Sequence, residues 1–386
     1  MPWKESDKMS ERMAFITRYR AGERITDLCR EFEISRPTGY ALVKRYEESG
    51  VTGLRDRSSR PRVSPSKTPR ATANEVIKLR KKYPTWGPRK LKQRLHVLHP
   101  EVRWPASSTI GAILSDEGLT KRRARRRRAT PSGTPLRQTS EPNELWCMDF
   151  KGQFRLGNRS YCYPLTISDH YSRYLTTCEA LDCTKTADTE LALNATFREF
   201  GLPLAIRSDN GSPFASTGRL GLSRLSVWLL RLGIDLERIE PGHPEQNGRH
   251  ERMHLTLKQD ATRPPATHQL KQQEKFDTFR RIYNEERPHE ALQMKTPGSV
   301  YRPSKRRLPE GLAPLDYPLH DHVSRVARNG VFHFTGVGHV YLGMAFAGQE
   351  IGLRELQTGT WLVSFMETDI GYLDVETKQI IDISAT

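Results

Sequence analysis

The stretch WCMDF at residues 146–150 is a short run of apolar and aromatic residues around a single carboxylate, Asp149. Its length and composition are typical of a buried strand. The surrounding pattern predicts further strands at 161–168, 174–179 and 204–208, and helices at 188–200, 220–232 and 248–258. Strands followed by helices in this order predict a three-layer α/β domain with a mixed sheet.

The region before this domain has the apolar spacing of helices instead. Residues 9–50 predict three short helices, and Ser35 before Arg36 and Pro37 is a helix-start signal. The third helix, 36–48, leaves five side chains free to contact DNA: Arg36, Thr38, Tyr40, Lys44 and Arg45. A helix-turn-helix unit, whose second helix fits a major groove, explains this pattern. A plain three-helix bundle with a basic solvated face explains it equally well.

Two basic, proline-containing segments separate the predicted folded parts. Residues 121–128, KRRARRRR, include Arg125, Arg126 and Arg127 and predict an arm that can hold DNA phosphates.

Residues 72–120 repeat the helical pattern and predict a second helix-turn-helix unit. The expected organisation is a helix-turn-helix domain at 1–51, a basic linker at 52–71, a second helix-turn-helix domain at 72–120, a basic flexible linker at 121–140, the α/β core at 141–303 and a C-terminal domain at 304–386.

The C-terminal domain has a strand pattern of its own. Short β-prone segments at 331–334, 339–342, 350–353, 361–365 and 372–375 are separated by turn residues. This spacing predicts a small antiparallel β-barrel. The expected fold class is therefore multidomain, with all-α units first, an α/β core next and a small C-terminal β-barrel.

Bulk composition narrows the partners. Lys and Arg number 62 and Asp and Glu 45 among 386 residues, a formal charge of +17 that favours a polyanionic partner. The five cysteines have no C-x-x-C spacing, so neither a disulfide framework nor a zinc site is expected. No secretory signal and no membrane-spanning stretch are expected, so a membrane partner is excluded and a cytoplasmic, nucleoid-associated location is predicted.

Three carboxylates stand out as chemistry-bearing. Asp149 lies inside an apolar strand, where a carboxylate is costly unless a cation compensates for its lost hydration. Asp209 ends the strand at 204–208, in Ser208-Asp-Asn-Gly211. Glu251 begins the helix that follows a loop rich in proline and glycine, and Lys258 lies two turns further along the same face.

These residues form a pattern that resembles a known family. W-x-x-D at Trp146 and Asp149, S-D-N-G-x-x-F from Ser208 to Phe214, and P-x-x-P-x-x-x-G-x-x-E with a later lysine, from Pro241 to Lys258, are similar to the catalytic core of retroviral integrases and bacterial insertion-sequence transposases. The stretch 283–292, YNEERPHEAL, looks like the end of that core. The resemblance covers residues 140–303 and implies a ribonuclease-H-like fold.

The resemblance also implies an activity and its cofactor. It implies a DNA transposase whose catalytic and metal-binding residues are Asp149, Asp209 and Glu251. Lys258 and Asn210 are then expected to contact DNA. Oxygen ligands suit Mg²⁺ or Mn²⁺, and two such ions about 3.5–4 Å apart can serve both oxygens of an in-line displacement. The implied partners are double-stranded DNA, both element ends and target, and further copies of the chain.

Some features depart from the family or leave alternatives open. The number of residues between Asp209 and Glu251 is 251 − 209 − 1 = 41, longer than is common in the family, and we place the extra residues in a surface excursion near 214–222. Glu245 competes with Glu251 as third ligand, although the motif register favours Glu251. His243, His250 and His254 are expected to be solvated or to face phosphate, although a histidine metal site is also possible. Two other functions fit: a catalytically silent DNA-binding regulator and a ribonuclease-H-type nuclease.

Overall fold

The computed structural model describes residues 7–56, 67–120, 137–240, 243–357 and 359–382. The chain divides into two compact units, Met1–Lys67 and Thr68–Thr386. The basic arm with Arg125, Arg126 and Arg127 lies outside the described residues. Within the described parts, no helix combines the length and apolarity needed to cross a membrane.

The first unit is a bundle of three helices followed by a 3-10 turn. Its elements are α1 (Lys8–Arg20), α2 (Ile25–Glu31), α3 (Arg36–Ser49) and η1 (Gly50–Leu54). Ser35 caps α3 by accepting a hydrogen bond from the Thr38 amide, as the sequence predicts. Gly39 allows α2 and α3 to pack closely, because an added Cβ there would lie 2.4 Å from Cys29 Sγ. Leu54 is fully buried in the bundle core, so the packed part of this unit continues past residue 51.

The second unit begins with another helical group. It contains α4 (Arg70–Lys82), α5 (Pro88–Leu98) and α6 (Ser107–Asp116). Pro88 occupies the first position of α5, where a missing amide hydrogen costs nothing. Trp86 and Trp104 are buried in the apolar core that the three helices share.

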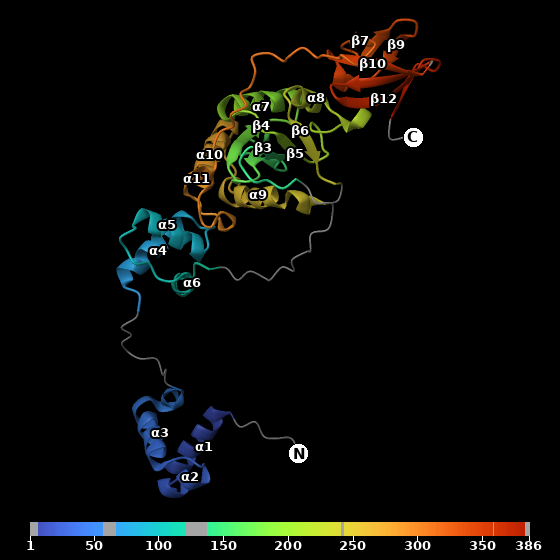
Figure 1. Cartoon of the computed structure of the whole chain (residues 1–386). Coiled ribbons are helices and arrows are strands. Elements are labelled where there is room, and N and C mark those ends of the chain that lie inside the picture. The colour runs from blue at the N-terminus through green and yellow to red at the C-terminus, as the bar shows by residue number, and fades with distance from the viewer. Residues whose placement is uncertain (1–6, 57–66, 121–136, 241–242, 358, 383–386) are drawn as a thin grey trace, which may run out of the picture. The chain divides into compact units, whose positions relative to one another are not determined.

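A mixed sheet forms the centre of the second unit (Figure 1). Its strands are β1 (Leu145–Phe150), β2 (Phe154–Arg155), β3 (Tyr161–Asp169), β4 (Leu175–Leu181), β5 (Ala205–Ser208) and β6 (Asp235–Arg238). The order is β2-β3-β1-β5-β6, with β4 also paired to β3. β1 runs antiparallel to β3 and parallel to β5, and β5 runs parallel to β6. The sequence did not predict β6, because this edge strand reads Asp-Leu-Glu-Arg and lacks an apolar run.

Helices cover both faces of this sheet. They are α7 (Thr186–Phe200), α8 (Arg224–Arg231), α9 (Gly248–Asp260), α10 (Gln269–Arg281) and α11 (Pro297–Val300), with short turns η2 (Arg219–Gly221), η3 (Pro244–Asn247), η4 (Ile282–Glu286) and η5 (Glu290–Leu292). α7 and α8 pack against Trp146 and Met148 of β1, whereas α9 and α10 pack on the face that carries Leu175 and Cys178 (Figure 1). The predicted three-layer α/β core is confirmed, although α10 was not predicted.

The residues expected to form a surface excursion have a packing role. Phe214 is buried against Phe150 in the core, and Ala215 and Leu222 form a β-bridge that closes the excursion. Leu222, just before α8, and Val227 of α8 are both buried in the apolar cluster of the C-terminal sheet. The extra residues between Asp209 and Glu251 therefore help to attach the C-terminal domain, which is a correction to the expectation of a simple surface loop.

The C-terminal domain is an open sheet with a separate hairpin, so the predicted closed barrel is wrong for the described residues. Its elements are β7 (His322–Arg325), β8 (Val331–Phe334), β9 (Gly338–Tyr341), η6 (Met344–Phe346), β10 (Glu350–Gln357), β11 (Thr360–Phe365), β12 (Thr368–Asp374) and β13 (Gln379–Asp382). The ladder runs β13-β12-β11-β10-β7 and ends there, while β8 pairs only with β9. Phe332 and Val340 of the hairpin share a core with Leu353 and Val363 of the sheet. The hairpin thus covers the apolar face as a second layer, and the ladder does not need to close to bury it.

Glu286 fastens the α4–α6 group to the core. Its carboxylate accepts hydrogen bonds from the Tyr83 hydroxyl, from Arg94 at 2.9 Å and from Arg281 at 2.6 Å. Burial alone raises the pKa of Glu286, but the hydrogen bonds from Tyr83 and Arg281 outweigh burial and hold the pKa below its usual value. Only 11% of the Glu286 side chain and 18% of the Arg94 side chain are exposed, so this ion pair is poorly screened by water.

We expect Glu286→Gln to lower the free energy of unfolding by about 2 kcal/mol, because a partly buried arginine loses its charged partner. The matched control is Glu290→Gln, since Glu290 pairs with Arg89 of α5 across 3.6 Å and both side chains are largely exposed. An exposed pair contributes about 0–1 kcal/mol. Urea unfolding of the full chain measures both variants, and equal destabilisation would show that Glu286 is not the main fastening.

Candidate active site

Asp149 lies at the end of β1 and points away from the α7 and α8 layer. Side chains alternate along a strand, and Trp146 and Met148 belong to the apolar core beneath those helices. Asp149 therefore faces the α9 side, where its Oδ2 lies 3.6 Å from Nδ1 of His254. The structure thus places Asp149 at the end of β1, close to residues of α9.

Asp209 follows β5 and lies beside Asp149. The parallel register pairs Leu145 with Ala205 and Cys147 with Arg207, an offset of 60 residues. The same offset two residues further on sets Asp149 beside Asp209 on strands about 4.8 Å apart. The Gly211 amide donates to Asp209 Oδ1 at 3.1 Å, which holds the carboxylate in the turn that ends the strand.

Glu251 lies in the first turn of α9, on the exposed side of the helix. The negative charge of Glu251, like that of Asp209, raises the pKa of Asp149. Burial is the largest cause of this shift and repulsion from Asp209 the second, and together they bring the pKa of Asp149 to about 7. The carboxylates of Asp209, after β5, and Glu251, on α9, are therefore both close enough to Asp149 to affect its charge.

A buried histidine pair connects α9 to the sheet beside these carboxylates. Nε2 of His250 and Nε2 of His254 lie 2.8 and 2.7 Å from the Thr166 hydroxyl oxygen. Nδ1 of His250 lies 2.8 Å from the Ser168 hydroxyl. Burial lowers the pKa of His250 to about 3 and, together with neighbouring His250, that of His254 to about 2, so both rings are neutral at pH 7.

The expectation that these histidines are solvated or face phosphate is therefore wrong. They are four residues apart on α9 and share its inner face with Met253 and Leu257, which are also buried. That i, i+4 spacing is the signal in the sequence that could have predicted their burial. Asp169, a nearby carboxylate, is also structural: it accepts hydrogen bonds from the Asn143 amide and from both the amide and the hydroxyl of Ser172.

Family comparisons match the regions that carry this geometry. The integrase core domain family matches residues 139–244 and 232–297. A helix-turn-helix domain family matches residues 11–62, and a homeodomain-like domain family matches residues 38–114. The integrase matches contain all three carboxylates, and the other two cover the helical segments that precede the core.

Proteins of bacterial insertion elements are similar over much of their length. An uncharacterized 39.2 kDa protein of insertion element IS476 from Xanthomonas euvesicatoria is 28% identical over 249 residues, 62% of this chain and 67% of the relative. An uncharacterized 31.7 kDa protein of insertion element IS407 from Burkholderia multivorans is 28% identical over 53% of this chain and 73% of the relative. Together, the family matches and these relatives support an insertion-sequence transposase with an integrase-type core.

Solved integrase structures are also similar to parts of this chain. The catalytic core domain of HTLV-2 integrase in complex with magnesium (trimeric form) is 16% identical, with a TM-score of 0.34, and covers 43% of this chain and 100% of that one. A simian T-cell lymphotropic virus intasome in complex with the PP2A regulatory subunit B56 gamma is 14% identical, with a TM-score of 0.38, and covers 77% of this chain and 95% of the matching chain.

A basic hollow lies close to these carboxylates. Lys151, Arg155, Lys258 and Arg263 line a space of about 460 Å³ whose described lining contains no carboxylate. Lys151 lies two residues beyond Asp149 and its positive charge lowers the pKa of that group, whereas Lys258 lies two turns beyond Glu251 on α9. None of the four cations forms an ion pair within the described parts of the chain. The sequence singled out Lys258 but missed the three arginine and lysine residues around it, because they come from separate segments.

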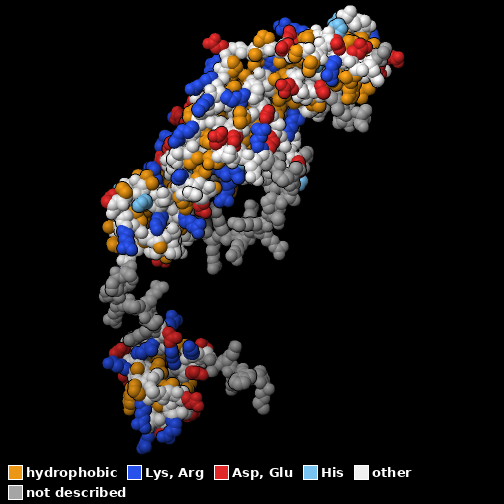
Figure 2. All heavy atoms as spheres, in the orientation of Figure 1, with side chains coloured by type: hydrophobic (Ala, Val, Ile, Leu, Met, Phe, Trp, Pro, Cys, Tyr) orange, Lys and Arg blue, Asp and Glu red, His pale blue; other side chains and the backbone are white. Residues whose placement is uncertain are grey.

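The other predicted DNA contacts lie in different settings. Arg36, Thr38, Tyr40 and Lys44 are exposed on α3, and basic side chains are spread over the surface of this helical bundle (Figure 2). Arg45 is half-buried and donates a hydrogen bond to the Arg55 carbonyl, so its guanidinium already has a structural partner. The Asn210 amide donates to the Ile239 carbonyl at 2.7 Å and ties the turn after β5 to the end of β6.

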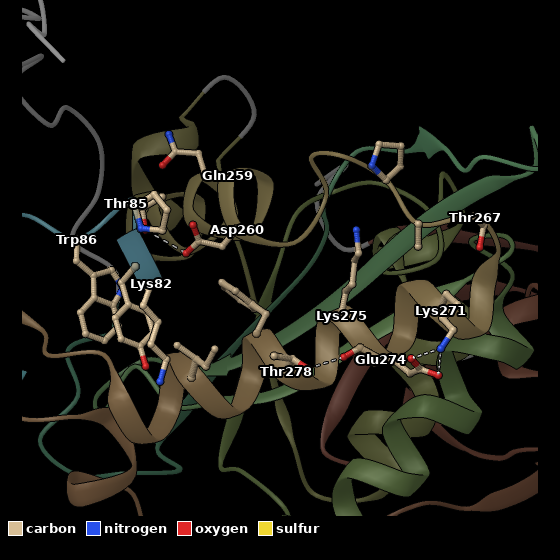
Figure 3. Close-up of a pocket in the computed structure, with 16 residues that line it drawn as sticks. Lys82, Thr85, Trp86, Gln259, Asp260, Thr267, Lys271, Glu274, Lys275 and Thr278 are labelled. Atoms are coloured by element: carbon tan, nitrogen blue, oxygen red, sulfur yellow. Dashed lines mark hydrogen bonds and ion pairs between the residues drawn. The ribbon is translucent and has the colours of Figure 1, made fainter. Parts of the chain in front are cut away.

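A larger hollow lies away from the carboxylates. It has a volume of about 720 Å³ and is lined by the segment after α4, the end of α9, and α10. Figure 3 shows Thr85 joined to Asp260 and Lys271 joined to Glu274 at its walls. Trp86 stacks on Tyr83 with ring centres 4.0 Å apart. Asp149, Asp209 and Glu251 do not line this hollow, so it is separate from the candidate active site.

Proposed function

We propose that this transposase binds the ends of an insertion sequence, cleaves them to expose 3′-OH ends and joins those ends to target DNA. In the first step water attacks the phosphorus at the element end and the P–O3′ bond breaks, which leaves a 3′-OH. In the second step that 3′-OH attacks a phosphodiester of the target, and a target 3′ oxygen departs. The observation that carries this proposal is the Asp149 carboxylate at the end of β1, whose pKa is raised by burial and by the nearby charges of Asp209 after β5 and Glu251 on α9.

Asp149, Asp209 and Glu251 are the residues that would hold the metal. A partly buried carboxylate with a pKa near 7, beside two further acidic groups, is unfavourable without a cation, and Mg²⁺ and Mn²⁺ prefer such oxygen ligands. Two bound ions would supply charge neutralisation at the attacking and leaving oxygens of the displacement. The fit of the acidic site to divalent cations therefore supports the cofactor expected from the family.

Residues of the chain would then bind and orient the DNA. Lys151, Arg155, Lys258 and Arg263 present unpaired positive charge beside the carboxylates, which suits the phosphates that flank a scissile bond. Arg36, Thr38, Tyr40 and Lys44 on α3 suit recognition of the element ends in a major groove. Two ends must be joined in one reaction, so we propose that at least two copies of the chain assemble on DNA.

We expect Glu251→Gln to reduce cleavage and joining by more than about 100-fold while DNA binding and folding stay intact, since Glu251 is exposed and loses only its charge. The assay uses the purified full chain, Mg²⁺ or Mn²⁺, and a duplex that carries the element's terminal sequence. Glu199→Gln, an exposed carboxylate near the end of α7, is the matched control. Glu245→Gln tests the competing carboxylate.

The outcomes of this assay separate the competing functions. Strand transfer that requires Glu251 supports the transposase proposal. Binding without cleavage by the unsubstituted chain would instead support a silent regulator, and cleavage confined to RNA in hybrids would support a ribonuclease-H-type nuclease. Loss of activity in Glu245→Gln but not in Glu251→Gln would indicate that Glu245, and not Glu251, is the third metal ligand.

A further inference from the structure

The hydrogen bonds around Thr166 fix where the ring hydrogens of the buried histidines lie. The Thr166 hydroxyl donates to the Asp149 carbonyl oxygen at 3.1 Å. A hydroxyl carries one hydrogen, so the same oxygen can only accept from the two imidazoles. Nε2 of His250 and Nε2 of His254 must therefore both carry hydrogen and donate to it, across 2.8 and 2.7 Å.

The second nitrogen of each ring is then a hydrogen-bond acceptor. Both rings are buried, which keeps them neutral, and a neutral imidazole with hydrogen on Nε2 has a lone pair on Nδ1. In His250 that lone pair accepts from the Ser168 hydroxyl at 2.8 Å. In His254 it faces Asp149 Oδ2 at 3.6 Å, beyond hydrogen-bond distance. Two electron-pair donors thus face each other across a gap that favours a positive charge.

We infer that Nδ1 of His254 and Oδ2 of Asp149 together bind a divalent transition-metal ion, with Mn²⁺ preferred to Mg²⁺. The inference rests on the proposed function in that Asp149 is taken as a metal ligand there. Metal–nitrogen and metal–oxygen bonds of about 2.1 Å can meet across a separation of 3.6 Å. Potential ligand atoms of Asp149, His254 and His250 all lie within 4.8 Å of one another.

His250 has a different role from His254. Both of its ring nitrogens are engaged with hydroxyls of β3, so it holds Thr166 and Ser168 in place and leaves ligation to His254. The Asp149 side chain is 23% exposed and that of His254 is 9% exposed, so an ion can reach the pair from the open side. Mg²⁺ strongly prefers oxygen and water, whereas an imidazole ligand favours transition metals. A mixed nitrogen and oxygen site therefore favours Mn²⁺ over Mg²⁺.

The direct test is electron paramagnetic resonance of Mn²⁺ added to the full chain without DNA. Pulsed measurements report a ¹⁴N nucleus bonded to the ion, and we expect that coupling in the unsubstituted protein. Protein grown with ¹⁵N-histidine should replace the ¹⁴N signal with a ¹⁵N one, which identifies the donor as histidine without any substitution. Bound Mn²⁺ that shows no nitrogen coupling would overturn the inference.

Variants assign the nitrogen to one residue. His254→Gln keeps an amide donor for Thr166 but removes Nδ1, so the nitrogen coupling should vanish and Mn²⁺ affinity should fall about tenfold or more, with little change for Mg²⁺. His339→Gln, which alters an exposed histidine of the C-terminal β8–β9 hairpin, should bind Mn²⁺ like the unsubstituted protein. Circular dichroism checks that each variant is folded. A nitrogen coupling that survives in folded His254→Gln would refute the assignment.

This experiment is independent of DNA chemistry. Nitrogen-coupled Mn²⁺ in a protein that neither cuts nor joins DNA would contradict the proposed function and leave the metal site standing. A protein that cuts and joins DNA but binds Mn²⁺ through oxygen alone would support the proposed function and contradict the inferred nitrogen ligand.

Discussion

Asp149→Asn is expected to stabilise the metal-free protein at pH 8 while it lowers DNA cleavage and joining by more than about 100-fold. Stability rises while activity falls because the Asp149 carboxylate affects both. Ionised Asp149 is unfavourable in the folded chain, where burial and the neighbouring charge of Asp209 raise its pKa to about 7. The same negative charge on Asp149 would bind the catalytic cation.

The pH dependence follows from the direction of that shift. Unfolded chains release the Asp149 proton near the ordinary pKa of 3.8, whereas the folded protein keeps it until about 7. The folded state therefore holds more protons between these values, and this group makes stability fall as pH rises through that window. At 1.36 kcal/mol per unit the fall is about 4 kcal/mol at most, and asparagine removes it.

Thermal unfolding in EDTA at pH 4 and pH 8 measures this effect. Asp182→Asn, which alters an exposed carboxylate just after β4, is the matched control and should change stability little. Added Mn²⁺ should raise the unfolding temperature of the unsubstituted protein but not that of Asp149→Asn. If Asp149→Asn is less stable than the unsubstituted protein at pH 8 in EDTA, the charge on Asp149 is not the unfavourable group.

His250→Ala should lower the free energy of unfolding by about 4 kcal/mol. The ring is 1% exposed and both nitrogens bond to hydroxyls of β3, so alanine leaves a cavity, removes the partner of the Ser168 hydroxyl and removes one of the hydrogen bonds of Thr166. α9 would lose the two hydrogen bonds of His250 to β3 and keep the one from His254 to Thr166, and the nearby position of Glu251 would lose precision. We therefore expect activity to fall with stability, measured by urea unfolding and by strand transfer.

His96→Ala provides the comparison for that experiment. His96 is exposed on α5, so its truncation should cost less than about 0.5 kcal/mol and leave strand transfer unchanged. A loss below about 1 kcal/mol in His250→Ala would mean that water replaces the ring and that the histidine pair does not hold α9 in place.

Local patterns predicted much of the core because its strands and helices are strongly periodic. The apolar strand around Asp149, the cap at Ser35 and the turn after β5 depend on neighbours within a few residues, which the sequence displays directly. β6 and α10 were missed. β6 is a polar edge strand that owes its pairing to β5, and such pairing leaves little trace in the strand's own residues.

Asn284 illustrates a role that only the folded chain explains. The sequence placed it in a stretch typical of the end of an integrase core, without a physical reason. In the structure its side chain is buried and bonds to both the amide and the carbonyl of Leu175, 109 residues away. It therefore completes the hydrogen bonding at the start of β4, as buried backbone groups require.

The sequence by itself determined the identities of the three carboxylates, their order along the chain and the α/β pattern that carries them, because spacing and alternation are local properties. Tertiary structure alone decided that the C-terminal sheet stays open, that 214–222 attaches it, and that the inner face of α9 brings His254 beside Asp149. Each of these depends on which surfaces bury one another across long separations in sequence. Packing of that kind is a property of pairs of distant residues, and no single stretch of the chain records it.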